Sequence, residues 1–308
     1  MNDYLGSRTA EGSFLFVMRS VLGLLFSILF GLIVLSFMAS VHPIGDSIAV
    51  FRAWIAIALL IVVILLVRGT AKFVGLVALV VMSVASPVAG NYYHATQDQA
   101  GPYTLYQKNL LYLNENQEAL IADFRDVRAD FITMQELWPV TLPVWRGLLD
   151  LYHHRLKCFG RGGNSASILS RWPFVDETKI CRDDLGFSAG QVELPEGRVW
   201  IVSLHLPWPY PFAQSDRVAK IVPILESLDG PVILGGDFNM VPWSRTMSLV
   251  EAAAGSERAG PILQSFRGAG GLLRLPIDHV LTPNGKGTVE TRPYLGSDHK
   301  GLLLRFSL

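Results

Sequence analysis

The chain has 308 residues, half of them hydrophobic, and its 26 basic residues balance its 26 acidic ones. A protein that holds a polyanion through many phosphate contacts normally carries an excess or a run of basic residues, and this sequence has neither. Composition therefore argues against a protein whose affinity depends on a strongly basic surface.

Three apolar runs in residues 1–92 predict a membrane domain. Residues 20–41 and 73–93 contain no charged side chain and have roughly the 20 residues that a bilayer-spanning helix needs. Residues 53–67 are fewer, and reach that length only if Arg52 extends its charged end to the lipid–water interface. We therefore expect three transmembrane helices that hold the protein in a lipid bilayer. The alternatives are three buried helices of a soluble protein or a cleaved signal peptide, and three successive runs disfavour both.

Basic residues flank these runs unequally. Arg8 and Arg19 precede the first run, and Arg68 and Lys72 lie between the second and the third, whereas the loop after the first run has no Lys or Arg. Short cytoplasmic loops carry the excess of Lys and Arg. We therefore expect a multi-pass protein of the cell inner (plasma) membrane, with a cytoplasmic N-terminus and with residues 93–308 on the periplasmic or extracytoplasmic side.

The two cysteines, Cys158 and Cys181, both follow the membrane runs. In an oxidising compartment they would be able to form a disulfide that closes a short loop. Two small buried thiols are equally consistent with the sequence.

The remainder of the chain is predicted to be a polar linker, residues 93–102, and one layered α/β domain, residues 103–308. Apolar runs of strand length alternate there with amphipathic helical patterns. The predicted strands are 103–108, 131–134, 154–158, 166–170, 198–204, 232–234, 277–281 and 301–306, and the predicted helices are 116–127, 215–228 and 244–253.

Several of these strands end in a carboxylate, a carboxamide or an imidazole. Strands that end in such residues predict one polar cluster at a sheet edge, which is a common way to build a hydrolytic metal site. The residues stand in six motifs: Gln107-Lys108-Asn109, Gln135-Glu136, Ser203-Leu204-His205, Gly236-Asp237-Phe238-Asn239, Ile277-Asp278-His279 and Ser297-Asp298-His299.

In this order, the six motifs resemble the endonuclease/exonuclease/phosphatase superfamily, specifically its bacterial membrane-anchored members. Any one motif is a weak match, but six in order across residues 103–308 are specific. The resemblance implies a four-layer α/β sandwich, in which two β-sheets pack face to face between outer helices. It also implies metal-dependent hydrolysis of phosphoesters.

The resemblance assigns a cation and a water to five of the residues. Glu136 is the expected ligand of Mg²⁺, a hard cation that prefers oxygen and for which Mn²⁺ can substitute, and Asn109 and Asp298 lie beside the same ion. Asp237 is expected to position or deprotonate the attacking water. Asn239 points to the same face of the extended chain and would fix either Asp237 or the phosphate.

The histidines are expected to act on the phosphate. By the resemblance, His299 contacts the phosphoryl oxygens, and Asp278 holds its ring in the required tautomer. His205 either donates a hydrogen bond to the phosphate or serves as a general acid. The pattern departs from nuclease members at Leu111, where a second acid is common, and this weakens an assignment to DNA repair while leaving Glu136 in place.

The sequence thus predicts a membrane-anchored, Mg²⁺-dependent phosphodiesterase acting on a lipid or small phosphodiester outside the cytoplasm. The alternatives are an Mg²⁺-dependent endo- or exonuclease and, less favoured by the complete polar set, a catalytically inactive binding module. The aromatic segment 208–212, directly after His205, would rim the cleft, where it could stack on a base or sugar or enter a lipid interface. A loop that packs its own aromatic rings is equally consistent.

Overall fold

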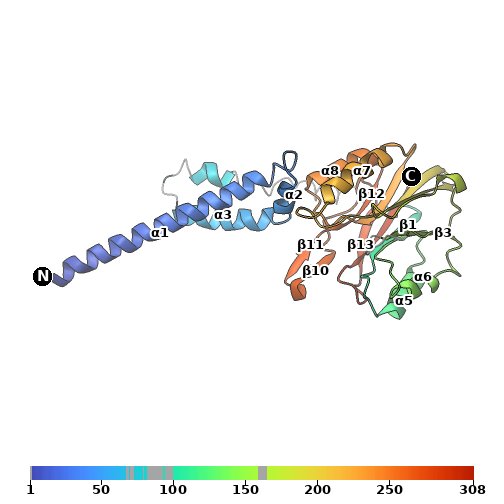
Figure 1. The fold of residues 1–308 in the computed structure, drawn as a ribbon, viewed down its shortest axis with the longest axis horizontal. Coiled ribbons are helices and arrows are strands. Elements are labelled where there is room, and N and C mark those ends of the chain that lie inside the picture. Colours follow the sequence, from blue (N-terminus) through green and yellow to red (C-terminus); the bar gives the residue numbers. More distant parts are fainter. Residues whose placement is uncertain are drawn as a thin grey trace. The chain divides into compact units, whose positions relative to one another are not determined.

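The computed structural model describes residues 2–66, 69, 73–78, 80–81, 93, 100–158 and 165–308. The chain divides into two compact units, Met1–Val88 and Ala89–Leu308. In the first unit, the described residues form α1 (Asn2–Leu35), α2 (Ile44–Ala49) and α3 (Arg52–Leu66), shown in blue in Figure 1. Within α1, the 23 residues Ser13–Leu35 are long and apolar enough to cross a membrane.

The prediction of three transmembrane helices has to be corrected, because Ser13–Leu35 alone meets that length among the described residues. Helix α3 has 15 residues, or about 22 Å of helix, which is less than the roughly 30 Å of a bilayer core. Arg52 is buried, donates to Ser36 Oγ and Ser36 O at 3.0 and 2.5 Å, and covers the ring of Phe37, so contacts within this unit hold its charged end.

The third predicted membrane helix, residues 73–93, lies largely outside the described residues. Residues 73–78 and 80–81 are helical. Most of the predicted linker, residues 93–102, also lies outside them, and the division between Val88 and Ala89 falls a few residues before its predicted start.

The second unit contains two six-stranded sheets, which we call sheet A and sheet B, and a separate hairpin. In spatial order, sheet A consists of β13 (Thr288–Arg292), β14 (Gly301–Phe306), β1 (Tyr103–Asn109), β2 (Phe131–Gln135), β4 (Ala166–Ser170) and β3 (His154–Leu156). Sheet B consists of β5 (Ile180–Arg182), β6 (Phe187–Leu194), β7 (Gly197–His205), β8 (Val232–Asp237), β12 (Asp278–Thr282) and β9 (Glu257–Arg258). The hairpin is β10 (Phe266–Gly268) and β11 (Leu273–Leu275).

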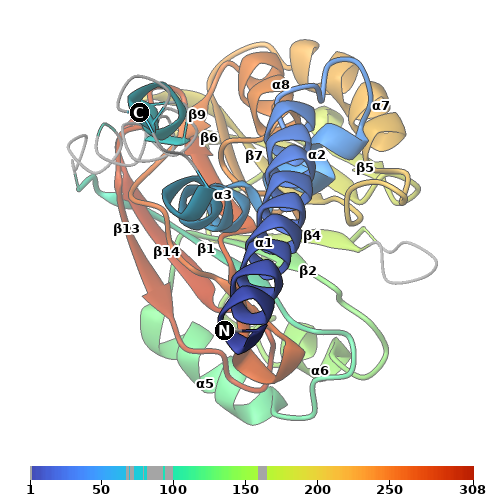
Figure 2. The ribbon, with the colours of Figure 1, turned by 90° about the vertical axis from the view of Figure 1, so that its left-hand side faces the viewer.

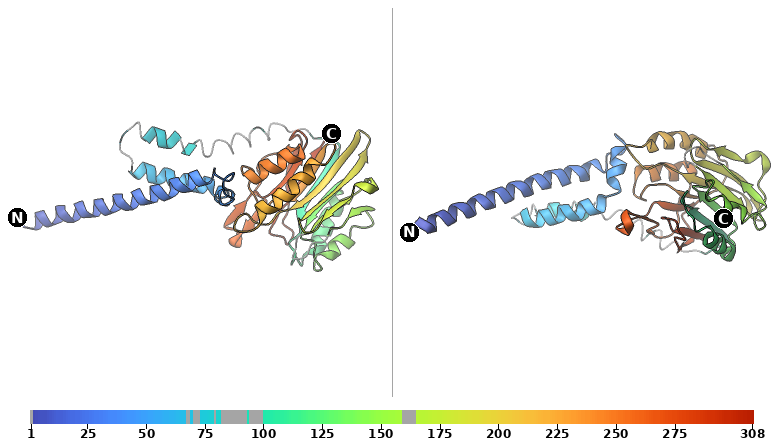
Figure 3. Two further views of the ribbon diagram at one scale, coloured as in Figure 1. Left: turned by 45° about the horizontal axis from the view of Figure 1, so that its top comes forward. Right: turned by 60° about the horizontal axis from the view of Figure 1, so that its bottom comes forward.

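The two sheets pack face to face over one apolar core, to which sheet A contributes Leu105 and Ile168 and sheet B contributes Ile201 and Ile233, all fully buried. Helices α5 (Gln117–Val127) and α6 (Leu142–Arg146) cover the outer face of sheet A, and α7 (Gln214–Glu226) and α8 (Arg245–Ala254) cover that of sheet B (Figure 2). Helices α7 and α8 lie against the strands in Figure 3, left. The unit is therefore an α/β sandwich with the predicted order of layers.

The helices of this sandwich bury the apolar positions that their spacing predicts. In α7, Val218, Ile221 and Leu225 recur every three or four residues and are buried. Helix α8 begins after Ser244, the first residue of the predicted helix, which serves as its N-cap because the Ser244 hydroxyl accepts from the Met247 N–H at 3.1 Å.

Strand direction brings the motif residues to one edge. Strands β1 and β2 run parallel, with Asn109 opposite Gln135, and β7 and β8 run parallel, with His205 opposite Asp237. Strand β12 is antiparallel to β8 and begins with Asp278 opposite Asp237. Since parallel strands end at the same edge of a sheet, β1 and β2 end together in sheet A, and the ends of β7 and β8 meet the start of β12 in sheet B.

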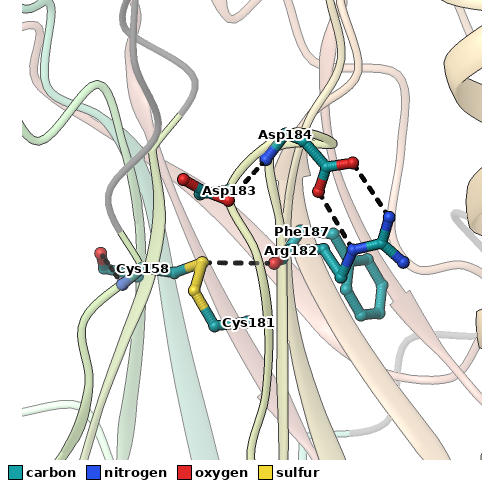
Figure 4. The surroundings of a disulfide bond; sticks show 7 residues. Cys158, Cys181, Arg182, Asp183, Asp184 and Phe187 are labelled. Atoms are coloured by element: carbon teal, nitrogen blue, oxygen red, sulfur yellow. Dashed lines mark hydrogen bonds and ion pairs between the residues drawn. A yellow bond between two sulfur atoms is a disulfide. The ribbon is translucent and has the colours of Figure 1, made fainter.

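Cys158 and Cys181 form a disulfide, with their Cα atoms 5.5 Å apart (Figure 4). Cys158 follows β3, which is an edge strand of sheet A, and Cys181 lies in β5, which is an edge strand of sheet B. The bond therefore links the edges of the two sheets, and the alternative of two separate thiols is not what the structure shows.

Replacing both cysteines by serine should destabilise the second unit, Ala89–Leu308. The bridged cysteines are 23 residues apart, and a loop of this size contributes about 3 kcal/mol in the chain-entropy model. Urea unfolding of the full chain in detergent, followed by tryptophan fluorescence, should show a lower midpoint for Cys158→Ser/Cys181→Ser. Reductant should lower the wild-type midpoint to that of the variant and leave the variant unchanged. Equal midpoints without reductant would show that the bridge contributes nothing.

Candidate active site

Three residues form the centre of the polar cluster: Asn109 at the end of β1, Glu136 directly after β2, and Asp237 at the end of β8. The Asn109 amide donates to Glu136 Oε1 at 3.0 Å and to Asp237 Oδ2 at 2.9 Å. His205 Nε2 lies 3.9 Å from that Glu136 oxygen and 3.8 Å from that Asp237 oxygen. Asn239 also contacts Asp237, donating its backbone N–H to Oδ1 at 2.9 Å.

The remaining predicted site residues join the cluster through His299, which approaches the same Asp237 oxygen. His299 Nε2 lies 3.7 Å from Asp237 Oδ2 and 3.9 Å from Asp298 Oδ1. His299 Nδ1 bonds to Asp278 Oδ2 at 2.7 Å. All eight predicted site residues therefore belong to one cluster, although they come from six separate places in the sequence.

Two site residues have a left-handed backbone, with φ of +57° at Glu136 and +48° at Asn239. This conformation is uncommon for residues with a Cβ, and it clusters at functional sites, where the surrounding structure holds it in place. Both residues stand just after a strand ends, where the turn directs their side chains toward the cluster. The Tyr112 N–H, which donates to Glu136 Oε2 at 2.9 Å, helps to hold the first of these turns.

Burial and neighbouring charge set the protonation of Asp237 and His205. The pKa of Asp237 is raised to about 7, mainly by burial; the charge of His299 lowers it, and the charge of Asp278 adds to the rise. Burial lowers the pKa of His205 below its usual value, although Glu136 opposes this. In the cation-free protein, His205 is therefore a neutral ring, and Asp237 titrates near neutral pH.

Asp278 and His299 form a buried charged pair. Burial alone would raise the pKa of Asp278, but the charge of His299, together with hydrogen bonds from His299, Ser265 and Gln107, holds it below its usual value. Burial works against the charged ring of His299, but Asp278 and Asp237 raise its pKa to about 10. The cationic histidine of the cluster is therefore His299.

The donor set suits a hard divalent cation. Among the described residues, Glu136, His205 and Asp237 offer ligand atoms within 4.8 Å of one another, as do Asp237, Asp278 and His299. Asp298 Oδ1 is buried and has no hydrogen-bond partner in the described part of the chain, which is an unusual state for a carboxylate oxygen and one that a cation would relieve. Carboxylate and amide oxygens are the ligands that Mg²⁺ prefers.

Gln107 belongs to the cluster but was not among the predicted site residues. It is fully buried, and its amide donates to Asp278 Oδ1 at 3.0 Å and to Gln135 Oε1 at 2.8 Å. Gln107 therefore restrains the carboxylate that holds His299. The signal in the sequence was its position two residues before Asn109, which places both side chains on one face of β1.

Lys108 was not predicted either, because its side chain and those of Gln107 and Asn109 point to opposite faces of β1. It is fully buried, and its ammonium group donates to the carbonyl oxygens of Pro293, Tyr294 and His299 at 3.3, 2.9 and 2.5 Å. It thus fixes the segment that carries Asp298 and His299. Ser297 adds a second restraint, since its hydroxyl donates to Asn109 O at 2.9 Å.

An α/β sandwich with acids, amides and histidines at its shared strand edge defines the class of phosphoester hydrolases. Comparison with known families agrees with this class. The chain belongs to the endonuclease/exonuclease/phosphatase family, whose model matches residues 106–299.

Solved structures share the fold at low sequence identity. TDP2 of D. rerio in complex with a single-strand DNA product is 14% identical, with a TM-score of 0.51, over 67% of this chain and 99% of that one. A mutant of beta toxin from Staphylococcus aureus with bound magnesium ions is 12% identical, with a TM-score of 0.50, over 66% and 99%. Sphingomyelinase C from Streptomyces griseocarneus is 18% identical, with a TM-score of 0.48, over 67% and 99%. A comparison with curated protein sequences gives no match.

Replacing Gln107 by methionine should lower kcat/KM for phosphodiester hydrolysis about tenfold or more, because the variant keeps the side chain's shape but loses a hydrogen bond to a charged carboxylate. Losing that bond also raises the pKa of Asp278, so the acid limb of the pH profile should move to higher pH. Gln264→Met is the matched control, since Gln264 is exposed. If both variants retain the wild-type rate and pH profile, Gln107 does not position Asp278.

Proposed function

We propose that this protein is a membrane-anchored, Mg²⁺-dependent phosphodiesterase that hydrolyses a lipid or small phosphodiester outside the cytoplasm. The observation that carries the proposal is the single cluster in which Asn109, Glu136 and Asp298 face Asp237 and His299. A phosphodiester is anionic and resists attack by hydroxide. Its hydrolysis requires a cation, an oriented water and stabilised oxygens, and this cluster contains groups suited to each.

The cation is assigned to Glu136, Asn109 and Asp298. When bound, Mg²⁺ or Mn²⁺ supplies positive charge to the phosphoryl oxygens and acidifies bound water. The orphaned Oδ1 of Asp298 supports the assignment. So do the magnesium ions of beta toxin, a protein of the same fold.

The attacking water is assigned to Asp237. This carboxylate is almost fully buried and is held by the Asn109 amide and the Asn239 N–H. A pKa of about 7 is that of a general base able to take a proton near neutral pH. Because nearby positive charge favours a carboxylate, a bound cation would lower this pKa and keep Asp237 ionised.

The phosphate is assigned to the two histidines. His299, charged through its pairing with Asp278, donates from Nε2 to a phosphoryl oxygen, and the buried pair keeps the ring oriented. His205 Nε2 faces the same centre from β7, where the neutral ring donates a hydrogen bond to the phosphate. Its lowered pKa does not favour the alternative role of a general acid. Its Nδ1 is buried without a hydrogen-bond partner among the described residues, so its tautomer is free to change.

The location is inferred from the rest of the chain. The apolar stretch Ser13–Leu35 supports a membrane anchor, and Arg8 and Arg19 before or within it support a cytoplasmic N-terminus. The disulfide between Cys158 and Cys181 supports an oxidising compartment for the catalytic unit. The absence of a basic excess favours a lipid or small diester over a nucleic acid.

The full chain in detergent should hydrolyse bis(p-nitrophenyl) phosphate in the presence of Mg²⁺, lose activity in EDTA, and recover when Mg²⁺ is restored. His205→Ala and Asp237→Ala should each lower kcat roughly a hundredfold or more, because each removes a proton-transfer or orienting group. The matched controls are His153→Ala and Asp176→Ala at exposed positions.

A panel of substrates then separates the candidate classes. Phospholipid vesicles, plasmid DNA and single-stranded DNA should be compared at equal enzyme concentration. Cleavage of lipid above DNA supports the proposal, whereas metal-dependent cleavage of DNA alone would make the protein a nuclease. Activity that survives EDTA and both active-site substitutions would refute the mechanism.

Fusions after Leu308 should report an extracytoplasmic C-terminus. In bacterial cells, alkaline phosphatase at this position should be active, because it needs an oxidising compartment to form its disulfides. Green fluorescent protein exported in the unfolded state should be dark. The reverse pattern would place the catalytic unit in the cytoplasm, where the disulfide would not be expected to persist.

A further inference from the structure

Exposed large apolar side chains of the catalytic unit gather in the loops that carry the site residues. Tyr93 and Leu308, at the two ends of the unit, are the exceptions among its described residues. The others follow Asn109, Glu136 and His205, or precede Asp278. They are Tyr112, Leu113, Val140, Trp208, Tyr210, Phe212 and Leu272, which we call the apolar rim.

Direct contacts join this rim to the active site. The Tyr112 N–H donates to Glu136 Oε2 at 2.9 Å. The ring of Trp208 packs edge-on against Phe266 at 5.5 Å between centroids, and Phe266 contacts the His299 ring at 5.0 Å. The loop after β7 and the hairpin β10–β11 are therefore neighbours beside the catalytic histidine.

The hairpin presents the most exposed side chain of the rim. Leu272 is 93% exposed and stands where the chain turns between β10 and β11, and this hairpin projects from the two sheets (Figure 1). Phe212, in the loop after β7, is 60% exposed. Single exposed apolar residues are ordinary, but seven of them in loops around one site indicate a contact surface.

The stem of the hairpin carries positive charge without a counter-ion. Arg267 and Arg274 stand directly opposite each other in the ladder, and both are exposed. Like charges at opposite positions of a strand pair destabilise it, and neither arginine forms an ion pair within the described part of the chain. Arg267 and Lys300 also both approach the ring of Tyr294. An anionic surface at this position would offset the repulsion.

We propose that the apolar rim and the Arg267–Arg274 pair dock the catalytic unit on an anionic lipid surface. Apolar side chains at a loop tip with basic side chains behind them match the lipid interface, where the tips enter the acyl boundary and the cations meet the headgroups. The metal site then opens onto the headgroup layer. This inference rests on the proposed function, and it specifies that the phosphodiester belongs to a lipid in a membrane surface.

Site-directed fluorescence on the full chain tests the docking. Leu272→Cys is labelled with the environment-sensitive dye NBD under non-reducing conditions, since the two native cysteines are bridged. The protein is then inserted into phosphatidylcholine vesicles with or without phosphatidylglycerol. Asp176→Cys is the matched control, because Asp176 is exposed and far along the chain from every loop of the rim. We expect a blue-shifted emission at position 272, with quenching by doxyl-labelled lipids, and neither effect at position 176.

Charge reversal tests the arginine pair. Adding Arg267→Glu and Arg274→Glu to the labelled protein should remove most of the blue shift that phosphatidylglycerol produces. Identical, water-like spectra at positions 272 and 176 in both kinds of vesicle would overturn the docking. A blue shift at 272 that is independent of phosphatidylglycerol and of both arginines would overturn the selection for anionic lipid.

The wild-type chain separates failure of this inference from failure of the proposed function. Its Mg²⁺-dependent hydrolysis of bis(p-nitrophenyl) phosphate requires the site but no lipid surface. Hydrolysis without a membrane signal at position 272 would overturn docking alone. A membrane signal without hydrolysis of any diester would overturn the proposed function.

Discussion

The two sheets meet closely behind the active site because residue 235 has no side chain. A Cβ at Gly235 on β8 would lie 2.5 Å from Thr133 Oγ1 on β2, so any larger residue would push the sheets apart. Three hydrogen bonds cross between the sheets near this position, from Asn109 to Asp237, from Gln107 to Asp278 and from Gln135 to Ser203. The site is therefore built across the sandwich, and neither sheet alone would contain it.

This construction places charged groups where water is scarce, which costs free energy unless each is paired. Asp278 is fully compensated, by His299 on one oxygen and by Gln107 on the other. Asp237 accepts hydrogen bonds from two neutral groups, the Asn109 amide and the Asn239 N–H, and Asp298 Oδ1 accepts none within the described part of the chain. Burial raises the pKa of both acids. Both lie near His299 Nε2, so a divalent cation would stabilise these two carboxylates more than it would stabilise Asp278. Within one cluster, Asp278 therefore holds His299 in place, whereas Asp237 and Asp298 are the acids that a cation would stabilise.

The sequence was most informative where an acid, an amide or a histidine stands at the end of an apolar run. A polar residue at that position is seldom needed for folding, so it indicates a functional site. The sequence was weaker where an element lacks an apolar pattern. Strand β13 is largely half-exposed, and β6 contains small residues, so neither was predicted. Lys108 could not be anticipated, since its three carbonyl partners lie far along the chain. The sequence predicted more membrane-spanning helices than the described residues contain. Counting apolar residues along the chain does not reveal that the helix is interrupted before Arg52, or that Arg52 forms hydrogen bonds with Ser36.

A membrane anchor and a docking surface would have different effects: the anchor would keep the catalytic unit near the bilayer, and the docking surface would set its orientation there. A membrane-spanning segment such as Ser13–Leu35 would raise the local concentration of the catalytic unit at a bilayer, but it would not by itself determine which face of that unit meets the lipid. A lipid phosphodiester presents its phosphate only at the membrane surface, so hydrolysis requires the strand edge with Glu136 and His299 to face the lipid. Apolar side chains in the loops of that same edge would select this orientation. The loops that hold the catalytic groups would thereby also determine which phosphates reach them.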